Sequence, residues 1–148
     1  MHLDYSLHPV TGKERRLNLI LYLNDGWDES WGGELELWDG TFTSCRVKVP
    51  PLFNRAVLFR TSDLSYHGLP RPLRCPKTTG RKSLAVYYVS PPRVGVTHRL
   101  KAEFRPLPHQ PHDEPLLRLY DIRKTRVLTA EDLDTIWPTW QQDGGGFW

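Results

Sequence analysis

The sequence contains only two cysteines, Cys45 and Cys75, among its 148 residues, and they form no C-x-x-C pair. So few cysteines cannot build a disulfide scaffold, and we expect both to be reduced thiols. No apolar run approaches the length that spans a bilayer, and the first residues lack the basic and apolar regions of a signal peptide. We therefore expect a cytoplasmic protein that does not enter a membrane.

An excess of charge of one sign is also missing, because 20 Lys and Arg stand against 17 Asp and Glu. The basic residues are scattered along the chain and form no stripe, which argues against a nucleic-acid-binding surface. With 148 residues, of which 39% are hydrophobic, the chain has the length of one globular domain with a core of modest size.

Short strands dominate the first 92 residues. In residues 16–24 side chains alternate, so that one face carries Leu17, Leu19, Leu21 and Leu23 and the other Asn18, Ile20, Tyr22 and Asn24. We expect the leucine face to pack against a second layer and the mixed face to line a pocket. Further strands, rich in β-branched and aromatic residues, are expected at 34–38, 45–49, 55–61 and 83–89. This pattern predicts an antiparallel sandwich or barrel.

After Pro91 and Pro92 the character of the chain changes, and we predict a division into a core, residues 1–92, and a C-terminal extension, residues 93–148. The extension is expected to be irregular, with one strand within 98–104, a Pro- and His-rich connector at 106–115, and a short helix with Thr129 as its N-cap. His109, His112 and Asp113 form an H-x-x-H-D cluster, which we interpret as exposed linker because no second pair of zinc ligands accompanies it.

The motif His2-Leu3-Asp4 is the main chemical feature of the sequence. In an extended segment residues i and i+2 project to the same side, about 6.5–7 Å apart, so His2 and Asp4 can reach one cation. The third ligand must come from a neighbouring strand or its end, and His67 follows the expected strand 55–61. Two imidazoles and one carboxylate hold non-haem Fe(II) on one face and leave other coordination positions open.

Arg81 supplies a second feature, because it is in phase with Ser83 and Ala85 at the start of a strand. The small side chains at Ser83 and Ala85 leave room for the guanidinium. A planar guanidinium can pair through two hydrogen bonds with a carboxylate. Ser83 can add a hydroxyl donor, and we expect Tyr22 to add another from the facing sheet.

Together these motifs resemble the 2-oxoglutarate/Fe(II)-dependent dioxygenases of the prolyl 4-hydroxylase type. The resemblance covers roughly residues 2–92. Its matching stretches are His2-Leu-Asp4, Leu21-Tyr-Leu-Asn24 with Trp27, Gly32-Gly33-Glu-Leu, Asn54-Arg-Ala-Val-Leu-Phe59, His67-Gly68 and Arg81-Lys-Ser-Leu-Ala-Val-Tyr-Tyr88.

The resemblance implies an all-β double-stranded β-helix, or jelly roll, in which His2, Asp4 and His67 bind iron. It implies that Arg81 holds the far carboxylate of 2-oxoglutarate, with Tyr22 and Ser83 assisting. The implied reaction hydroxylates a C–H bond of a peptidyl-proline or small-molecule substrate and converts 2-oxoglutarate to succinate and CO2. Ascorbate is the reductant that the resemblance implies.

Relatives of this type have strands and helices before the H-x-D motif, so we expect the core to be N-terminally truncated, either as a fragment or as a shortened variant. An exposed sheet edge is then expected, which favours oligomers. Two rival hypotheses are an inactive β-sandwich or interaction module of this family, and a nucleic-acid demethylase with the same iron chemistry. Trp27, Trp31 and Trp38 could frame a substrate groove, although packing under a loop explains them better.

Overall fold

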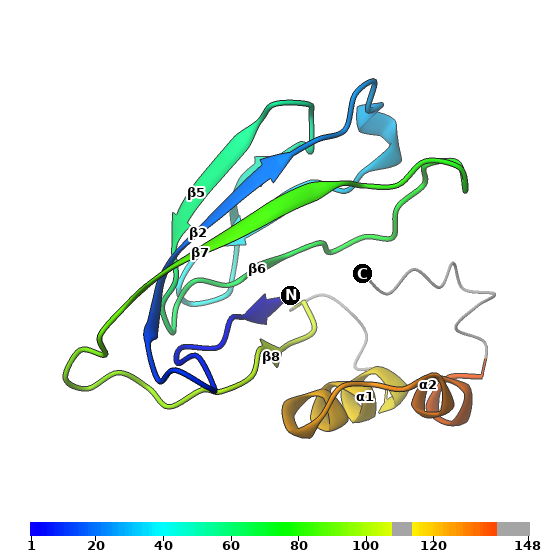
Figure 1. The fold of residues 1–148 in the computed structure, drawn as a ribbon. Coiled ribbons are helices and arrows are strands. Elements are labelled where there is room, and N and C mark those ends of the chain that lie inside the picture. The colour runs from blue at the N-terminus through cyan, green and yellow to red at the C-terminus, as the bar shows by residue number, and fades with distance from the viewer. Residues whose placement is uncertain (108–113, 139–148) are drawn as a thin grey trace.

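The computed structural model describes residues 1–107 and 114–138. Within them, two antiparallel sheets form the core and two short helices follow (Figure 1). The strands are β1 (His2–Leu3), β2 (Glu14–Tyr22), β3 (Leu35–Trp38), β4 (Cys45–Val49), β5 (Ala56–Arg60), β6 (His67–Gly68), β7 (Ser83–Ser90) and β8 (Glu103–Phe104). The helices are a 3-10 turn η1 (Glu29–Trp31), α1 (Glu114–Thr125) and α2 (Ala130–Ile136).

The larger sheet has the order β4-β3-β6-β1-β8, and the smaller sheet has the order β5-β2-β7. The two sheets contact each other through side chains of their facing sides, for example the rings of Phe59 on β5 and His67 on β6, whose centroids are 4.7 Å apart. This arrangement confirms the predicted all-β class with a double-stranded β-helix type of core and a short-helical C-terminal part.

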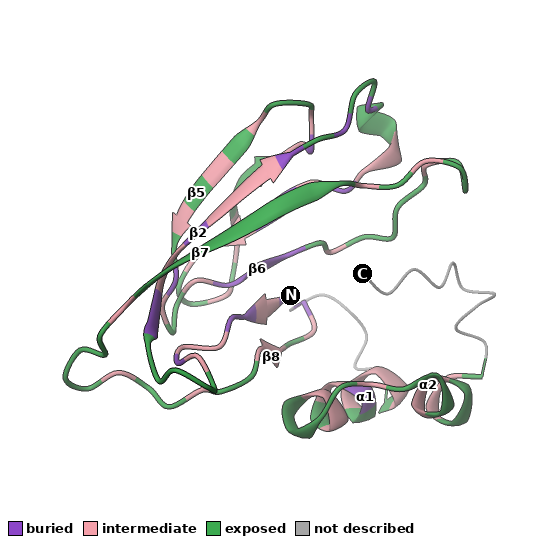
Figure 2. Ribbon diagram, in the orientation of Figure 1, coloured by how far each residue is buried: buried purple, intermediate pink, exposed green. Residues whose placement is uncertain are grey.

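The leucine face of β2 does not pack against the second layer, so this part of the prediction was wrong. Its neighbours on the same face include Leu58 of β5 and Val86 of β7, which are 58% and 47% exposed. The opposite face carries Asn18 and Tyr22, which are buried. Strand β7, by contrast, is exposed along nearly its whole length (Figure 2). The mixed face therefore lines the interior, as predicted. Its polar side chains can be buried there because they are hydrogen-bonded.

One irregularity in β2 turns an arginine toward the interior. The register between β2 and β7 shifts between Arg15 and Leu17, so that Arg16 is the extra residue of a bulge. In a regular strand Arg15 would share the face of the leucines. The bulge instead lets its guanidinium reach the side-chain oxygen of Asn18 on the interior face.

The extension after residue 92 is more ordered than the sequence indicated. Of the strand expected within 98–104, only Glu103–Phe104 forms, and this strand, β8, pairs with β1 of the larger sheet. Helix α1 was not predicted, because Pro115 was assigned to a connector. A proline is tolerated in the first turn of a helix, where its missing N–H has no helical partner. The predicted division at residue 92 stays a prediction.

The second helix agrees with its prediction. Thr129 is the N-cap of α2, and its side chain accepts a hydrogen bond from the backbone N–H of Asp132, whose carboxylate accepts one in return. The cluster of His109, His112 and Asp113 lies outside the described residues. In the described part of the chain no helix is both long and apolar enough to cross a membrane.

Candidate metal centre

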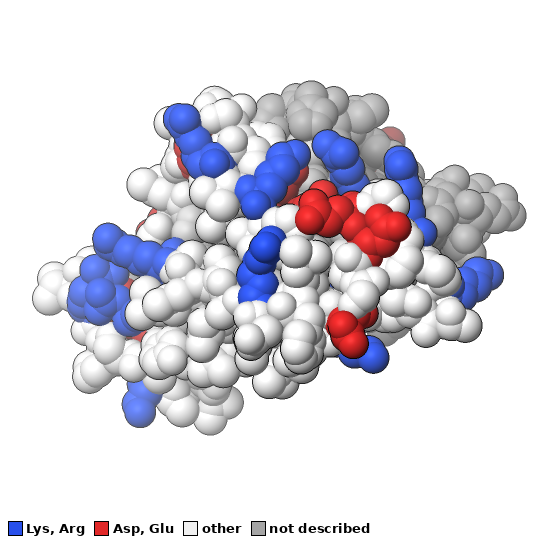
Figure 3. Space-filling model, turned by 90° about the horizontal axis from the view of Figure 1, so that it is seen from above, with Lys and Arg blue, Asp and Glu red and all other residues white. Residues whose placement is uncertain are grey.

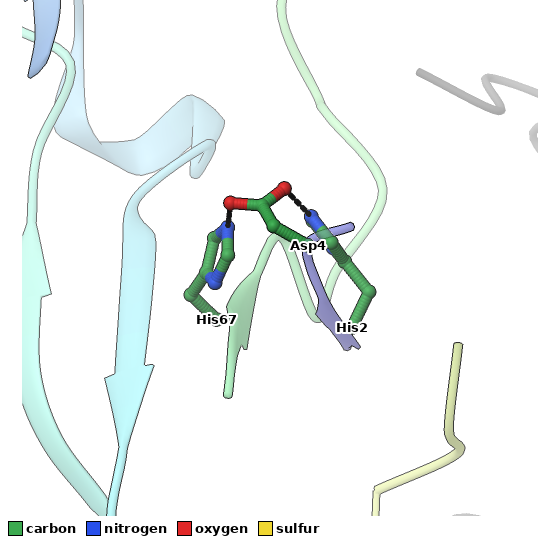
Figure 4. A group of neighbouring side chains, drawn as sticks. All are labelled: His2, Asp4 and His67. Atoms are coloured by element: carbon green, nitrogen blue, oxygen red, sulfur yellow. Dashed lines mark ion pairs between the residues drawn. The ribbon is translucent and has the colours of Figure 1, made fainter. Parts of the chain in front are cut away.

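His2, Asp4 and His67 come together on the inner side of the larger sheet (Figure 4). Strands β1 and β6 are antiparallel neighbours in which His2 pairs directly with His67, so both imidazoles project to the same face. Asp4 follows two residues after His2. One ligand atom from each of the three residues lies within 4.8 Å of the other two. The structure therefore brings together the donors that the sequence predicted.

The Asp4 carboxylate lies between the two imidazoles. Its Oδ1 is 3.5 Å from Nε2 of His2, and its Oδ2 is 3.4 Å from Nε2 of His67. Burial acts to raise the pKa of Asp4, but the hydrogen bond from His2 and the charges of His67 and Arg15 outweigh it and lower the pKa to about 2. The carboxylate is therefore ionised at neutral pH, as a metal ligand must be.

His67 is buried and keeps an uncharged ring. Burial, together with repulsion from His2, lowers its pKa to about 4. Its Nδ1 lies 2.8 Å from the carbonyl oxygen of Ser65, so a proton on Nδ1 would leave the lone pair of Nε2 facing Asp4. Two imidazoles and an ionised carboxylate on one face form the donor set that suits Fe(II), so the residues fit the metal that the resemblance implies.

A buried network, which the sequence did not reveal, orients Asp4. The amide nitrogen of Asn18 donates a hydrogen bond of 2.7 Å to Oδ2 of Asp4. The guanidinium of Arg15 donates two hydrogen bonds, of 2.9 and 2.7 Å, to the amide oxygen of Asn18. It also stacks on the ring of Tyr87, at 3.5 Å from the ring centre. Asn18 was expected on a pocket face, but the role of Arg15 depends on the bulge at Arg16, which has no clear sequence signal.

Arg81 and Tyr22 form a second polar group in the interior. Nε of Arg81 donates to the carbonyl oxygen of Gly33 at 2.8 Å, and Nη2 donates to the hydroxyl of Tyr22 at 3.2 Å. Within the described residues, the remaining N–H groups of Arg81 have no hydrogen-bond partner. Burial lowers the pKa of Arg81 and raises that of Tyr22, yet an arginine retains its charge in a protein. A ligand can therefore meet a positive group here.

Close packing under Arg81 requires a glycine at position 33. A Cβ on Gly33 would lie 2.8 Å from a methyl carbon of Leu73 and 3.2 Å from Cδ of Arg81, and the residue has a φ of +81°. Strands β2 and β7 are neighbours in one sheet, so the expectation that Tyr22 comes from the facing sheet was wrong. Ser83 pairs with Tyr22 and faces the same side, but its side chain is exposed and has no hydrogen bond among the described residues.

The two polar groups lie along one face of β2. Asn18 contacts Asp4 at one position, and Tyr22 contacts Arg81 four residues further on. Four residues of strand correspond to roughly 13 Å. A ligand that joins the candidate metal position to Arg81 must therefore be elongated and must carry negative charge at its far end.

The tryptophans of the loop before β3 serve packing. Trp27 is buried, donates from its indole nitrogen to the carbonyl oxygen of Gly32 at 3.0 Å, and meets the ring of Trp31 edge-on at 5.3 Å. Trp38 donates to a carboxylate oxygen of Glu36 at 2.8 Å. These contacts favour the packing interpretation over a substrate groove.

A hollow of about 250 Å³ opens beside Asp4. Asp4 and Arg15 line it from the core, Asp63 from the segment between β5 and β6, and Arg93 and Arg99 from the segment after β7. Its wall carries both carboxylates and guanidiniums, so the hollow is polar and has no net charge of one sign.

Comparison with known proteins points in one direction. Residues 1–89 match the family described as the 2OG-Fe(II) oxygenase superfamily. The chain is also 30% identical over 108 residues to prolyl 3-hydroxylase OGFOD1 of Mus musculus, a match that includes 70% of this chain and 19% of that protein. The chain thus spans about a fifth of the length of this curated relative.

Proposed function

This chain belongs to the 2OG-Fe(II) oxygenase superfamily, and we propose that it is an Fe(II)- and 2-oxoglutarate-dependent dioxygenase that hydroxylates a C–H bond of a peptidyl-proline or small-molecule substrate. The observation that carries this proposal is the convergence of His2, Asp4 and His67, with every pair of donor atoms within 4.8 Å. His67 lies 63 positions after Asp4 in the chain, and the pairing of β1 with β6 brings it to the other two donors.

His2, Asp4 and His67 would hold the iron, each through one donor atom. When iron, 2-oxoglutarate and dioxygen are bound, the metal supplies the oxidising chemistry: one oxygen atom enters the substrate C–H bond and the other enters the succinate that forms with release of CO2. The role of the protein would be to hold the three donors on one face, with the His67 imidazole neutral and the Asp4 carboxylate ionised, so that cosubstrate and oxygen could reach the metal from the other side.

Arg81 would bind the distal carboxylate of 2-oxoglutarate. Its Nε is held by the carbonyl oxygen of Gly33, which fixes the plane of the guanidinium and directs its other N–H groups away from that carbonyl. The hydroxyl of Tyr22 accepts from Nη2 and can donate its own proton to the same carboxylate. A five-carbon diacid is elongated and carries a carboxylate at each end, one of which would face the metal and the other Arg81. We assign Ser83, which faces the same side of the sheet as Tyr22, a weaker contact with this carboxylate.

A prolyl residue is the substrate that we propose first, because the relative that covers 70% of this chain is named a prolyl 3-hydroxylase. The polar hollow beside Asp4 offers room for the backbone and side chains that flank such a residue in a peptide. We also propose that ascorbate keeps the iron reduced and that the protein acts in the cytoplasm.

The surface favours this proposal over a nucleic-acid demethylase. On the face shown in Figure 3, Lys and Arg side chains are scattered and several adjoin Asp or Glu. A nucleic-acid-binding surface needs a continuous positive stripe along the phosphates.

Turnover of 2-oxoglutarate tests the proposal. The purified chain should form succinate only when both Fe(II) and 2-oxoglutarate are present, and a proline-containing peptide should increase the rate. Arg81→Ala should raise the 2-oxoglutarate concentration required for half-maximal turnover by at least tenfold, because a charge-assisted contact of about 1.5–3 kcal/mol is lost. Arg118→Ala, a change at an exposed residue of α1, is the matched control and should leave the requirement unchanged.

Iron binding by Arg81→Ala should stay close to that of the parent chain, and an equal loss of both would contradict the role assigned to Arg81. A folded chain that binds iron but forms no succinate with any substrate would favour the inactive interaction module.

A further inference from the structure

Residues 93–105, which lead from the end of β7 back to the side of β1, are called here the return segment. It lies after residues 1–89, which match the oxygenase family. The family match therefore assigns no role to it. In the structure it runs back along the core and ends in β8, which pairs with β1 (Figure 1).

Strand β1 contains only His2 and Leu3 and has β6 on one side and β8 on the other. Without β8 it would be a two-residue edge strand. The return segment holds the chain on either side of β1, because Arg105 N–H donates to the carbonyl of Met1 at 2.8 Å and Ser6 N–H donates to the carbonyl of Arg99 at 2.7 Å. The segment from His2 to Asp4, which carries two of the three donors, is therefore fixed along its outer edge by the return segment.

Arg99 connects the two halves of the candidate metal centre. Its Nε donates a hydrogen bond of 2.6 Å to the backbone carbonyl oxygen of Asp4. Its Nη1 donates one of 2.8 Å to the carboxylate of Asp63, which lies four residues before His67. One side chain, which is 12% exposed, thus binds both the backbone of Asp4 and the segment that leads to His67.

Phe104 contacts the remaining donor. It pairs directly with His2 across β1 and β8, and its ring centre lies 5.1 Å from that of the His2 imidazole. On its other side the His2 ring is 4.3 Å from the ring of His67. Tyr120 of α1 stacks on Phe104 at 5.8 Å and supports it from behind. The His2 imidazole is therefore held between two rings.

We propose that the return segment is a working part of the metal centre, in which Arg99 positions Asp4 relative to His67, and Phe104 sets the orientation of the His2 imidazole. The inference rests on the proposed function, because it requires a metal at these three donors. Arg99 and Phe104 are positioning residues, since neither would touch the metal. Residues that orient metal ligands commonly change metal affinity 10- to 100-fold when they are replaced.

The test uses the full chain and Mn(II) as an air-stable probe, with bound and free ion separated by their electron paramagnetic resonance signals. Arg99→Ala and Phe104→Ala should each weaken Mn(II) binding about 10- to 100-fold. Phe104→Tyr retains the ring beside His2 and should restore the parent affinity to within about threefold. The visible absorption of bound Co(II) should change in Arg99→Ala and Phe104→Ala, because the ligand geometry around the ion changes.

Arg93→Gln is the matched control. Arg93 anchors the same return segment through hydrogen bonds to the carboxylate of Glu14 but contacts none of the three donors. This variant should lose stability in thermal unfolding yet bind Mn(II) with the parent affinity. It therefore separates a general loosening of the segment from the loss of contacts to the ligands.

If both alanine variants fold and bind Mn(II) with the parent affinity, the inference is overturned and the proposed function stands. The same holds if Arg93→Gln loses as much Mn(II) affinity as the alanine variants do. If the parent chain itself bound no Mn(II), the inference and the proposed function would both fall. If one alanine variant fails to fold, the other decides between these outcomes, since the two side chains act on different donors.

Discussion

The two oxygens of the Asp4 carboxylate have different neighbours, and this asymmetry decides how it can bind a metal. Oδ2 accepts a short hydrogen bond, of 2.7 Å, from the Asn18 amide. Oδ1 has only longer contacts, of 3.5 Å to Nε2 of His2 and 3.4 Å to the Arg15 guanidinium. Arg15 donates to the oxygen of Asn18, so the amide nitrogen must point at Asp4. Asn18 therefore favours a carboxylate that coordinates through a single oxygen.

Replacement of Asn18 tests this residue-scale account. Asn18→Leu keeps a similar volume but removes the donor to Asp4, and we expect Mn(II) affinity to fall about 10- to 100-fold. Asn24→Leu is the control, because Asn24 is also buried but bonds to Pro51 and Lys82 instead. The free energy of unfolding and the Mn(II) dissociation constant should be measured for both. Equal weakening of metal binding in the two variants would contradict the role of Asn18.

At the scale of elements, much of the core could be predicted from the sequence because alternation and turn residues define short strands. Strand β4 has the predicted bounds, and β7 extends the predicted 83–89 by one residue. The sequence predicted that His67, which follows the strand 55–61, would meet His2 and Asp4, but not that it lies on a short strand of its own, β6, paired with β1. The direction of the leucine face could not be predicted, since alternation separates two faces without showing which of them meets the other sheet.

The bulge and the C-terminal elements could not be predicted for related reasons. The bulge at Arg16 reverses which face the side chains before it occupy. No residue type at this position signals a bulge in the sequence. Strand β8 has two residues and is defined by its pairing with β1, not by local propensity. The sequence already suggested Tyr22 as a hydroxyl donor beside Arg81, and the structure adds the hydrogen bond between them.

The contact between β2 and the return segment predicts a pH dependence of stability. Arg93 donates several hydrogen bonds to the buried carboxylate of Glu14 and thereby lowers the pKa of Glu14 below its ordinary value of 4.5. A group whose pKa is lower in the folded state stabilises the protein above its unfolded pKa, and this contribution disappears as the pH falls through the folded pKa.

Glu14→Gln should therefore lower the free energy of unfolding at pH 7, and the difference from the parent chain should shrink as the pH falls below the ordinary pKa of about 4.5. Denaturant unfolding at several pH values measures both quantities. A difference that stayed constant, or grew, toward acid pH would contradict the ionised pairing of Glu14 with Arg93.

For the molecule as a whole, the outward face of the smaller sheet is an exposed apolar surface. Leu58, Leu84, Val86 and Tyr88 on this face are each 47–58% exposed. Strand β7 is also the edge of its sheet and pairs only with β2 among the described strands. Exposed apolar faces and free strand edges both favour association with another chain.

We therefore predict that the isolated chain self-associates through this face and edge. Val86→Lys places a charge on β7 and should shift the chain toward the monomer in light scattering across a concentration series. Leu100→Lys, at a residue that is 53% exposed but lies outside the sheet, should leave association unchanged. A parent chain that stays monomeric at every concentration would refute the prediction.

An anaerobic titration with Fe(II) is the most direct measurement of the central claim. The parent chain should bind one ion, and Asp4→Ala should lose that binding by more than about a hundredfold, because the sole anionic donor of the three is removed. Asp121→Ala, at a carboxylate whose side chain is 73% exposed, should bind as the parent does. Undiminished binding by Asp4→Ala, or no stoichiometric binding by the parent chain, would contradict the assignment of His2, Asp4 and His67 as the iron ligands.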